Sequence, residues 1–119
     1  MQNDIQKVLI SEQQLQSRIA ELAEQVSADY AGKDPVFVGV LKGVVMFFGD
    51  FVKRVTVPCQ IDFMCISSYS GTESTGNMQV KMDINTKIQD RHVVIVEDII
   101  DSGNTLYNLK RLLNGRSPK

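Results

Sequence analysis

Acidic side chains follow a short apolar run within the stretch from Val93 to Leu106. Glu97 and Asp98 are adjacent carboxylates, which repel each other unless a cation or hydroxyl groups satisfy them. A ribose diol donates hydroxyl hydrogen bonds, and Mg²⁺ prefers carboxylate and phosphate oxygens. The pair therefore predicts a site for a sugar, a magnesium ion or both.

A second candidate binding element follows these two carboxylates. Residues 101–105 read Asp-Ser-Gly-Asn-Thr, and a helical pattern starts near Thr105. Backbone N–H groups at such a turn and helix N-terminus bind anions, so a phosphate monoester fits here. The alternative is an ordinary strand-to-helix turn in which Asp101 or Ser102 caps the helix and the carboxylate pair is solvated. That alternative explains each part separately, whereas a sugar-phosphate site explains the whole stretch.

The apolar pattern indicates which elements position these residues. Val93–Val96 lacks polar alternation, which predicts a strand buried on both faces of a parallel sheet. Ligands of such sheets lie beyond the carboxyl ends of the strands, where Glu97 falls. Residues 35–41 read as another apolar strand, closed by Lys42 and Gly43 at the same edge. A lysine there would meet an anion, and a solvated side chain is the alternative. The helix expected next places its apolar side chains on one face: Val44, Phe47, Phe48, Phe51 and Val52.

The amino-terminal part predicts a packing helix. Ser11 is the expected N-cap, Gln14 completes a capping box, and Ile10 with Leu15 forms a hydrophobic staple. Gly32 is a suitable stop. The expected apolar stripe consists of Leu15, Ile19, Leu22, Ala23 and Val26.

Two further strands are expected at residues 60–67 and 78–84, with the second at an edge of the sheet because apolar and polar residues alternate along it. The connection 68–77 is either a surface hairpin or an active-site lid. Residues 85–91 read as a polar connection, and His92 lies at the amino end of its strand, which favours a structural role over acid–base catalysis. The last helix carries a leucine stripe and ends at Gly115: Leu106, Leu109, Leu112 and Leu113.

The stretch Val93–Leu106 resembles the phosphoribosyl-pyrophosphate motif of type I phosphoribosyltransferases. Its Glu-Asp-Ile-Ile-Asp-Ser-Gly run is similar to the hypoxanthine-guanine branch, since adenine and orotate members usually carry a small residue where Asp101 stands. The resemblance implies an α/β fold, with a parallel sheet flanked by helices and a hairpin lid, in one partial domain over residues 1–119. The family's domain continues beyond the position of Lys119, so its C-terminal strands and most of its purine site are missing from this sequence.

The resemblance also implies a role for each candidate residue. Glu97 and Asp98 would hold the ribose hydroxyls, directly or through Mg²⁺, and Asp101 would be the acid–base group at the purine N7. The Leu41-Lys42-Gly43 loop would bind pyrophosphate, with a cis peptide between Leu41 and Lys42. The lid would contribute Ser68 and Tyr69. The 5′-phosphate would bind to Asp101, Ser102, Gly103, Asn104 and Thr105, with Asn104 acting through its backbone N–H.

The activity implied is purine salvage, the transfer of a 5-phosphoribosyl group from phosphoribosyl pyrophosphate to hypoxanthine or guanine. The products are IMP or GMP and pyrophosphate, Mg²⁺ is the cofactor, and the family forms dimers or tetramers. The alternative is a catalytically impaired fragment or a regulatory protein that only binds phosphoribosyl pyrophosphate or a nucleotide. A flavodoxin-like signalling module would explain the acidic sheet edge but not the phosphate loop.

Composition narrows the function classes. The chain has 119 residues, is 43% hydrophobic and carries a net charge of −1, which fits a globular domain and argues against nucleic-acid binding. The longest apolar run, Val44–Phe48, is too short to span a bilayer, and no signal peptide is apparent. Cys59 and Cys65 have no metal-ligand spacing, so we expect small buried hydrophobes in a reducing cytoplasm. No Walker motif is present.

Overall fold

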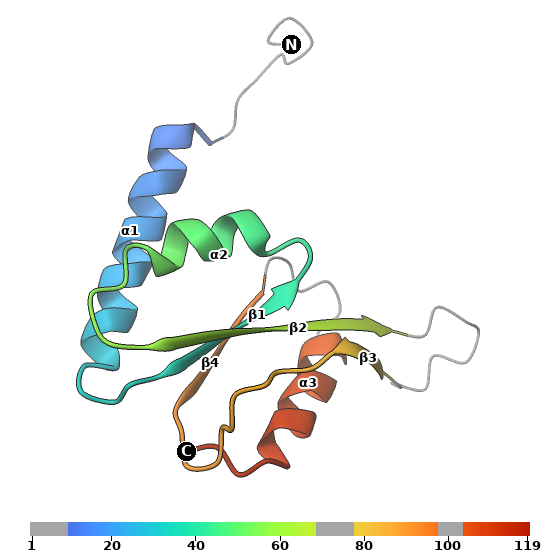
Figure 1. The fold of residues 1–119 in the computed structure, drawn as a ribbon. Helices are drawn as coiled ribbons and strands as arrows, with labels where there is room; N and C mark the ends of the chain where they lie inside the picture. Colours follow the sequence, from blue (N-terminus) through green and yellow to red (C-terminus); the bar gives the residue numbers. More distant parts are fainter. Residues whose placement is uncertain (1–9, 69–77, 98–103) are drawn as a thin grey trace, which may run out of the picture.

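The computed structural model describes residues 10–68, 78–97 and 104–119, with the backbone alone at 67–68, 78 and 104–105. Helices and strands alternate along most of the chain, as the apolar pattern predicts (Figure 1). The elements are α1 (Glu12–Asp29), β1 (Val36–Leu41), α2 (Val45–Val52), β2 (Gln60–Ser68), β3 (Met78–Met82), β4 (Val93–Val96) and α3 (Asn104–Asn114).

The four described strands form one mixed sheet in the order β3-β2-β1-β4. β1 is parallel to both β2 and β4, and β3 runs antiparallel to β2 at the edge, which confirms the expected edge hairpin. Every residue from Val36 to Val40 is buried, because β1 has a neighbour on each side and helices over both faces. The strand before the candidate pyrophosphate loop is therefore the most enclosed part of the sheet.

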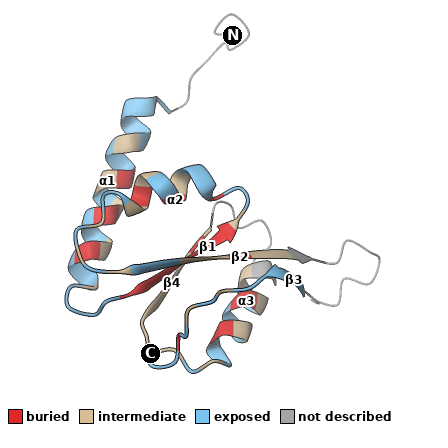
Figure 2. Cartoon of the chain, in the orientation of Figure 1, coloured by how far each residue is buried: buried red, intermediate tan, exposed pale blue. Residues whose placement is uncertain are grey.

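Each face of the sheet has its own apolar core (Figure 2). α1 and α2 pack over the face that carries Phe37, with Phe48 and Phe51 of α2 buried against it. α3 covers the opposite face, where Leu109 joins β1 and β2 side chains. The period of two along β1 thus sends alternate side chains into different cores.

The start of α1 confirms the capping box and corrects the apolar stripe. The Gln14 N–H donates to the Ser11 hydroxyl at 3.1 Å, and the Ser11 N–H donates to the Gln14 side chain at 2.9 Å. Ile19 is buried, but Leu15 is 45% exposed and Ile10 is 65% exposed. The core therefore begins one turn later than the stripe predicts, because the first turn of α1 extends past α2.

The prediction that β4 is buried on both faces is met in part, since its side chains pack against both cores. Val96 is buried, whereas Val93 to Ile95 are only partly buried. Within the described ranges, β4 pairs with β1 alone and so forms an edge of the sheet. A run of apolar residues indicates that a strand can be buried. The neighbouring strands and helices determine how much of its surface is buried.

The connection from β3 to β4 contributes a side chain to the core, although its sequence predicts a polar connection. Ile88 is 2% exposed and belongs to the core beneath α3. Asp62 on β2 holds this connection, because it accepts hydrogen bonds from the Asn85 N–H at 2.9 Å, the Thr86 N–H at 2.9 Å and the Thr86 hydroxyl at 2.8 Å. Partial burial opposes ionisation of Asp62, but these donors outweigh it and lower its pKa.

A surface ion pair links the residue after β3 to the residues after α3. The two terminal nitrogens of the Arg116 guanidinium donate to the Asp83 carboxylate, Nη1 to Oδ1 at 2.9 Å and Nη2 to Oδ2 at 2.7 Å. These bonds lower the pKa of Asp83. None of the described helices has the length and apolar character needed to cross a membrane.

Candidate functional site

Parallel pairing brings two of the candidate segments to one edge of the sheet. Val96 pairs with Gly39, so Glu97 leaves β4 on the same edge where Leu41 leaves β1. β1 and β4 are neighbours, with no strand between them. The candidate pyrophosphate loop and the acidic stretch therefore leave adjacent strands at their carboxyl ends, as predicted.

The loop after β1 has the geometry that the resemblance implies. The Leu41–Lys42 peptide is cis, which confirms that expectation. Lys42 and Gly43 are exposed, and the Val45 N–H donates to the Lys42 carbonyl at 3.1 Å, which closes the turn into α2. Val44, the N-cap of α2, has no polar side chain to accept from the first helical N–H groups. An exposed ammonium thus lies beside a helix N-terminus that has no side-chain cap, and both favour an anion.

The acidic segment is described at its two ends. Glu97 is half-buried, with one carboxylate oxygen out of contact with solvent. α3 begins at Asn104, so the acidic segment leads into a helix N-terminus as predicted. Asp98 and residues 101–103 lie outside the described part, as does Tyr69. For Ser68, Asn104 and Thr105 only the backbone is described.

Glu97 offers a carboxylate of the kind that binds Mg²⁺. Within residues 10–68, 78–97 and 104–119, no group of three or more acidic, histidine or cysteine side chains could hold a metal. Proteins commonly bind Mg²⁺ through one or two carboxylates together with substrate phosphates and water. Glu97, followed in sequence by Asp98, is the described candidate ligand.

Histidine and cysteine are two further residue types that can carry chemistry, and here their surroundings are those of structural residues. His92 lies at the amino end of β4, away from the candidate site, where its ring packs edge-on against Tyr30 with centroids 5.9 Å apart. Cys59 is half-buried beside the core under α1 and α2, and burial with the nearby Asp34 charge raises the pKa of its thiol. Cys65 is also free and half-buried. These surroundings favour structural roles, although both cysteines are half-buried where full burial was expected.

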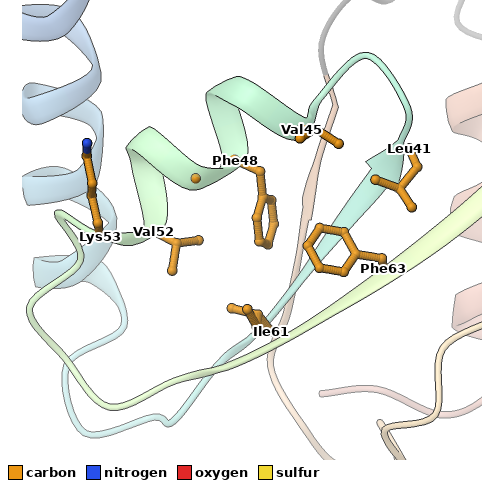
Figure 3. Close-up of a pocket in the computed structure, with 8 residues that line it drawn as sticks. Leu41, Val45, Phe48, Val52, Lys53, Ile61 and Phe63 are labelled. Carbon is orange, nitrogen blue, oxygen red and sulfur yellow. The ribbon is translucent and has the colours of Figure 1, made fainter.

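An apolar cavity of about 510 Å³ lies between α2 and β2 (Figure 3). Phe48 and Phe63 project into it, and Lys53 is the one charged residue in its lining. Phosphate groups need several donors or cations, so this cavity does not suit them. The candidate chemistry therefore lies at the carboxyl edge of the sheet and not in this cavity.

Comparisons with known proteins agree with the motif. The family model described as phosphoribosyl transferase domain matches residues 8–119. The bifunctional protein TilS/HprT of Listeria innocua is 48% identical over 100% of this chain, which spans 18% of that protein. The hypoxanthine-guanine phosphoribosyltransferase of Streptococcus pneumoniae is 44% identical over 98% of this chain, which spans 65% of it.

Solved structures extend the likeness to three dimensions. A hypoxanthine phosphoribosyltransferase from Staphylococcus aureus superposes with a TM-score of 0.92 at 43% identity, covering 100% of this chain and 65% of that one. The mostly parallel sheet with helices on both faces fits this likeness. On this sequence, fold and family match, the chain belongs to the type I phosphoribosyltransferase family.

Proposed function

We propose that this chain supplies the phosphoribosyl pyrophosphate side of a hypoxanthine-guanine phosphoribosyltransferase site. In the reaction, the bond from ribose C1′ to pyrophosphate breaks and a bond from C1′ to purine N9 forms, giving IMP or GMP. The observation that carries the proposal is the shared sheet edge, where the Lys42 loop and the acidic segment leave adjacent parallel strands. The chain spans 65% of the Streptococcus pneumoniae relative that carries this activity by name, and the whole reaction is part of this proposal.

The reaction needs a stabilised leaving anion and a stabilised, electron-poor ribose. Lys42 and the backbone N–H groups of its loop would bind the pyrophosphate. Glu97 and Asp98 would hold the ribose hydroxyls and offset the positive charge that develops at C1′. When bound, Mg²⁺ supplies charge neutralisation and orientation of the pyrophosphate.

The other residues of the proposed site act at the phosphate and the base. Residues 101–105 would bind the 5′-phosphate through N–H groups at the start of α3. Asp101 would also hydrogen-bond the purine N7 and hold the proton that shifts as N9 is alkylated. Ser68 and Tyr69 would close over the pyrophosphate and exclude water.

Titration calorimetry with phosphoribosyl pyrophosphate and Mg²⁺, run beside an assay for IMP, tests the proposal. Lys42→Ala should weaken binding by about 10- to 150-fold, because a charge-assisted hydrogen bond contributes about 1.5–3 kcal/mol. Lys53→Ala is the matched control, since Lys53 lies just beyond the far end of α2 and pairs with Asp50 at 3.3 Å. Equal affinity of the two variants would contradict the role of Lys42.

The same pair of assays separates the two functional hypotheses. Nucleotide formation by the 119-residue chain would assign it the full reaction, whereas binding without IMP would assign it the role of a binding fragment or regulator. Asp101→Asn separates binding from acid–base chemistry, because it should retain binding and lower any turnover. Loss of binding in Asp101→Asn would instead show that the Asp101 carboxylate itself, and not only the backbone N–H groups of residues 101–105, is needed for binding.

We also propose a cytoplasmic homo-oligomer, either a dimer or a tetramer. Exposed apolar side chains at the start of α2 support self-association, since Val45 is 51% exposed and Met46 is 79% exposed. Light scattering after gel filtration should give a multiple of 13.3 kDa for the parent chain. Met46→Asp should shift the mass toward that of one chain.

A further inference from the structure

Gly39 lies in β1 between the strand that leads to the acidic segment and the neighbouring strand β2. It pairs with Val96, which precedes Glu97, on one side and with Phe63 of β2 on the other. Lys42 follows Gly39 by three residues, just after β1 ends. This one residue is therefore close in register or in sequence to both candidate segments of the site.

The Phe48 ring of α2 lies against the backbone of Gly39. A Cβ atom at Gly39 would lie 2.8 Å from Cδ1 and 3.0 Å from Cε1 of Phe48, and the shorter distance is about 0.6 Å less than the 3.4 Å of ordinary contacts. Two neighbouring ring atoms are involved, so one side of the ring occupies the position that a side chain would take. The missing side chain of Gly39 therefore sets how closely α2 approaches β1.

Hydrogen bonds connect Phe48 to the loop after β1. The Phe48 N–H donates to the Val44 carbonyl at 2.7 Å, and the Val45 N–H donates to the Lys42 carbonyl at 3.1 Å. Val44 and Phe48 are buried, so their side chains hold the first turn of α2 against the core. Val45 and Met46 are exposed and contribute less to its position. The place of Phe48 therefore determines where the N-terminus of α2 meets the loop.

The apolar cavity adjoins this contact, and Val45 and Phe48 form part of its lining (Figure 3). Atoms that line a cavity lack packed neighbours on one side, so the start of α2 is held chiefly from the side of β1. An aromatic side chain in a helix has two common χ1 rotamers, so displacement of its ring moves the backbone that carries it. An atom added at Gly39 should therefore push the first turn of α2 away from β1.

We propose that Gly39 is a positioning residue for the pyrophosphate loop at residues 41–43. By leaving room for Phe48, it holds the N-terminus of α2 at the sheet edge where Glu97 leaves β4. This inference rests on the proposed binding of phosphoribosyl pyrophosphate at that edge. Groups in a binding site must be held within about 0.5 Å, and a misplacement of about 1 Å can cost on the order of 100-fold. An obstruction of about 0.6 Å in Gly39→Ala should therefore weaken pyrophosphate binding about tenfold.

Two measurements on the 119-residue chain test this role. In Gly39→Ala, nuclear magnetic resonance of the ligand-free chain should show shifted amide signals at Lys42 and Val45. Calorimetric titration with pyrophosphate and Mg²⁺ should show binding weakened about tenfold. In a Phe48→Leu background, which lacks the ring, Gly39→Ala should change the affinity by about twofold or less. Ser11→Ala removes the cap hydrogen bond of α1 and lowers stability to a similar degree, so it should leave both measurements unchanged.

The outcomes separate this role from the proposed function. Unmoved Lys42 and Val45 amides in Gly39→Ala overturn the role, because the Phe48 ring then yields alone. Equal weakening in both backgrounds, or by Ser11→Ala, also overturns it, because the loss then reflects stability or another contact. Phe48→Leu alone should weaken binding, and unchanged affinity there overturns the role even if Gly39→Ala does not fold. Shifted amides in a chain that does not bind pyrophosphate would support the role and contradict the proposed function.

Discussion

Gly39 occupies a position in β1 that leaves little room for a side chain. A Cβ atom there would lie 2.8 Å from Cδ1 of Phe48 and 3.1 Å from Cδ1 of Phe63. The two rings pack together with centroids 4.8 Å apart, and Phe48 is buried. Gly39→Ala should therefore destabilise the fold by forcing these rings apart.

The size of the effect follows from opposing contributions. Overpacking a core costs about 1–3 kcal/mol. Replacing glycine lowers the conformational entropy of the unfolded chain, which stabilises the folded state by about 0.4–1 kcal/mol. Both rings line the cavity between α2 and β2, so they have some space into which to yield. We expect a net loss of about 1 kcal/mol in the free energy of unfolding.

Urea unfolding followed by far-ultraviolet circular dichroism measures this loss, and Gly49 offers a matched control. A Cβ atom at Gly49 meets nothing within 4 Å, and this glycine lies inside α2. Gly49→Ala should stabilise the chain by up to about 1 kcal/mol through helix propensity. Phe48→Leu should reduce the cost of Gly39→Ala by removing the contact. A Gly39→Ala variant as stable as the parent would refute the packing argument.

Three further variants test local interactions. Asp62→Ala should cost about 1–3 kcal/mol, because it leaves the donors of Asn85 and Thr86 without their acceptor, and thermal unfolding measures it. Ser11→Ala should cost about 1 kcal/mol through loss of the capping box, and an unchanged urea midpoint would contradict that role. The pKa of Asp83 is lowered in the folded state, so its stabilising effect is present above the usual aspartate pKa of about 3.9 and disappears as the pH falls through the lower folded value. Asp83→Asn should flatten the urea midpoint against pH in that acid range, by a small amount because the pair with Arg116 is partly exposed.

The features of the fold that sequence alone predicts are those set by residues close together in the chain. The Ser11–Gln14 capping box and the start of α3 depend on residues within one helical turn, so sequence alone indicates them. A continuous apolar run predicts β1, and the alternation of apolar and polar residues predicts the edge position of β3. The motif from Val93 to Leu106 by itself resembles the family that the comparisons show.

The tertiary structure decided features that depend on distant partners. No local pattern indicates that Asp62 holds the Thr86 segment, that Ile88 enters the core, or that Gly39 faces Phe48. Each depends on which strands become neighbours, and that choice balances burial over the whole sheet.

The candidate site shows the same division. Sequence alone determined which hydrogen-bonding groups the Val93–Leu106 stretch offers, because carboxylates, hydroxyls and backbone N–H groups have defined donors and acceptors. The sequence also predicts that the Lys42 loop and Glu97 share one edge of the sheet, but only the tertiary structure makes β1 and β4 direct neighbours, although Glu97 follows Lys42 by more than fifty residues. The strand order also leaves β4 only partly buried, because burial depends on a neighbouring strand and not on the apolar residues themselves.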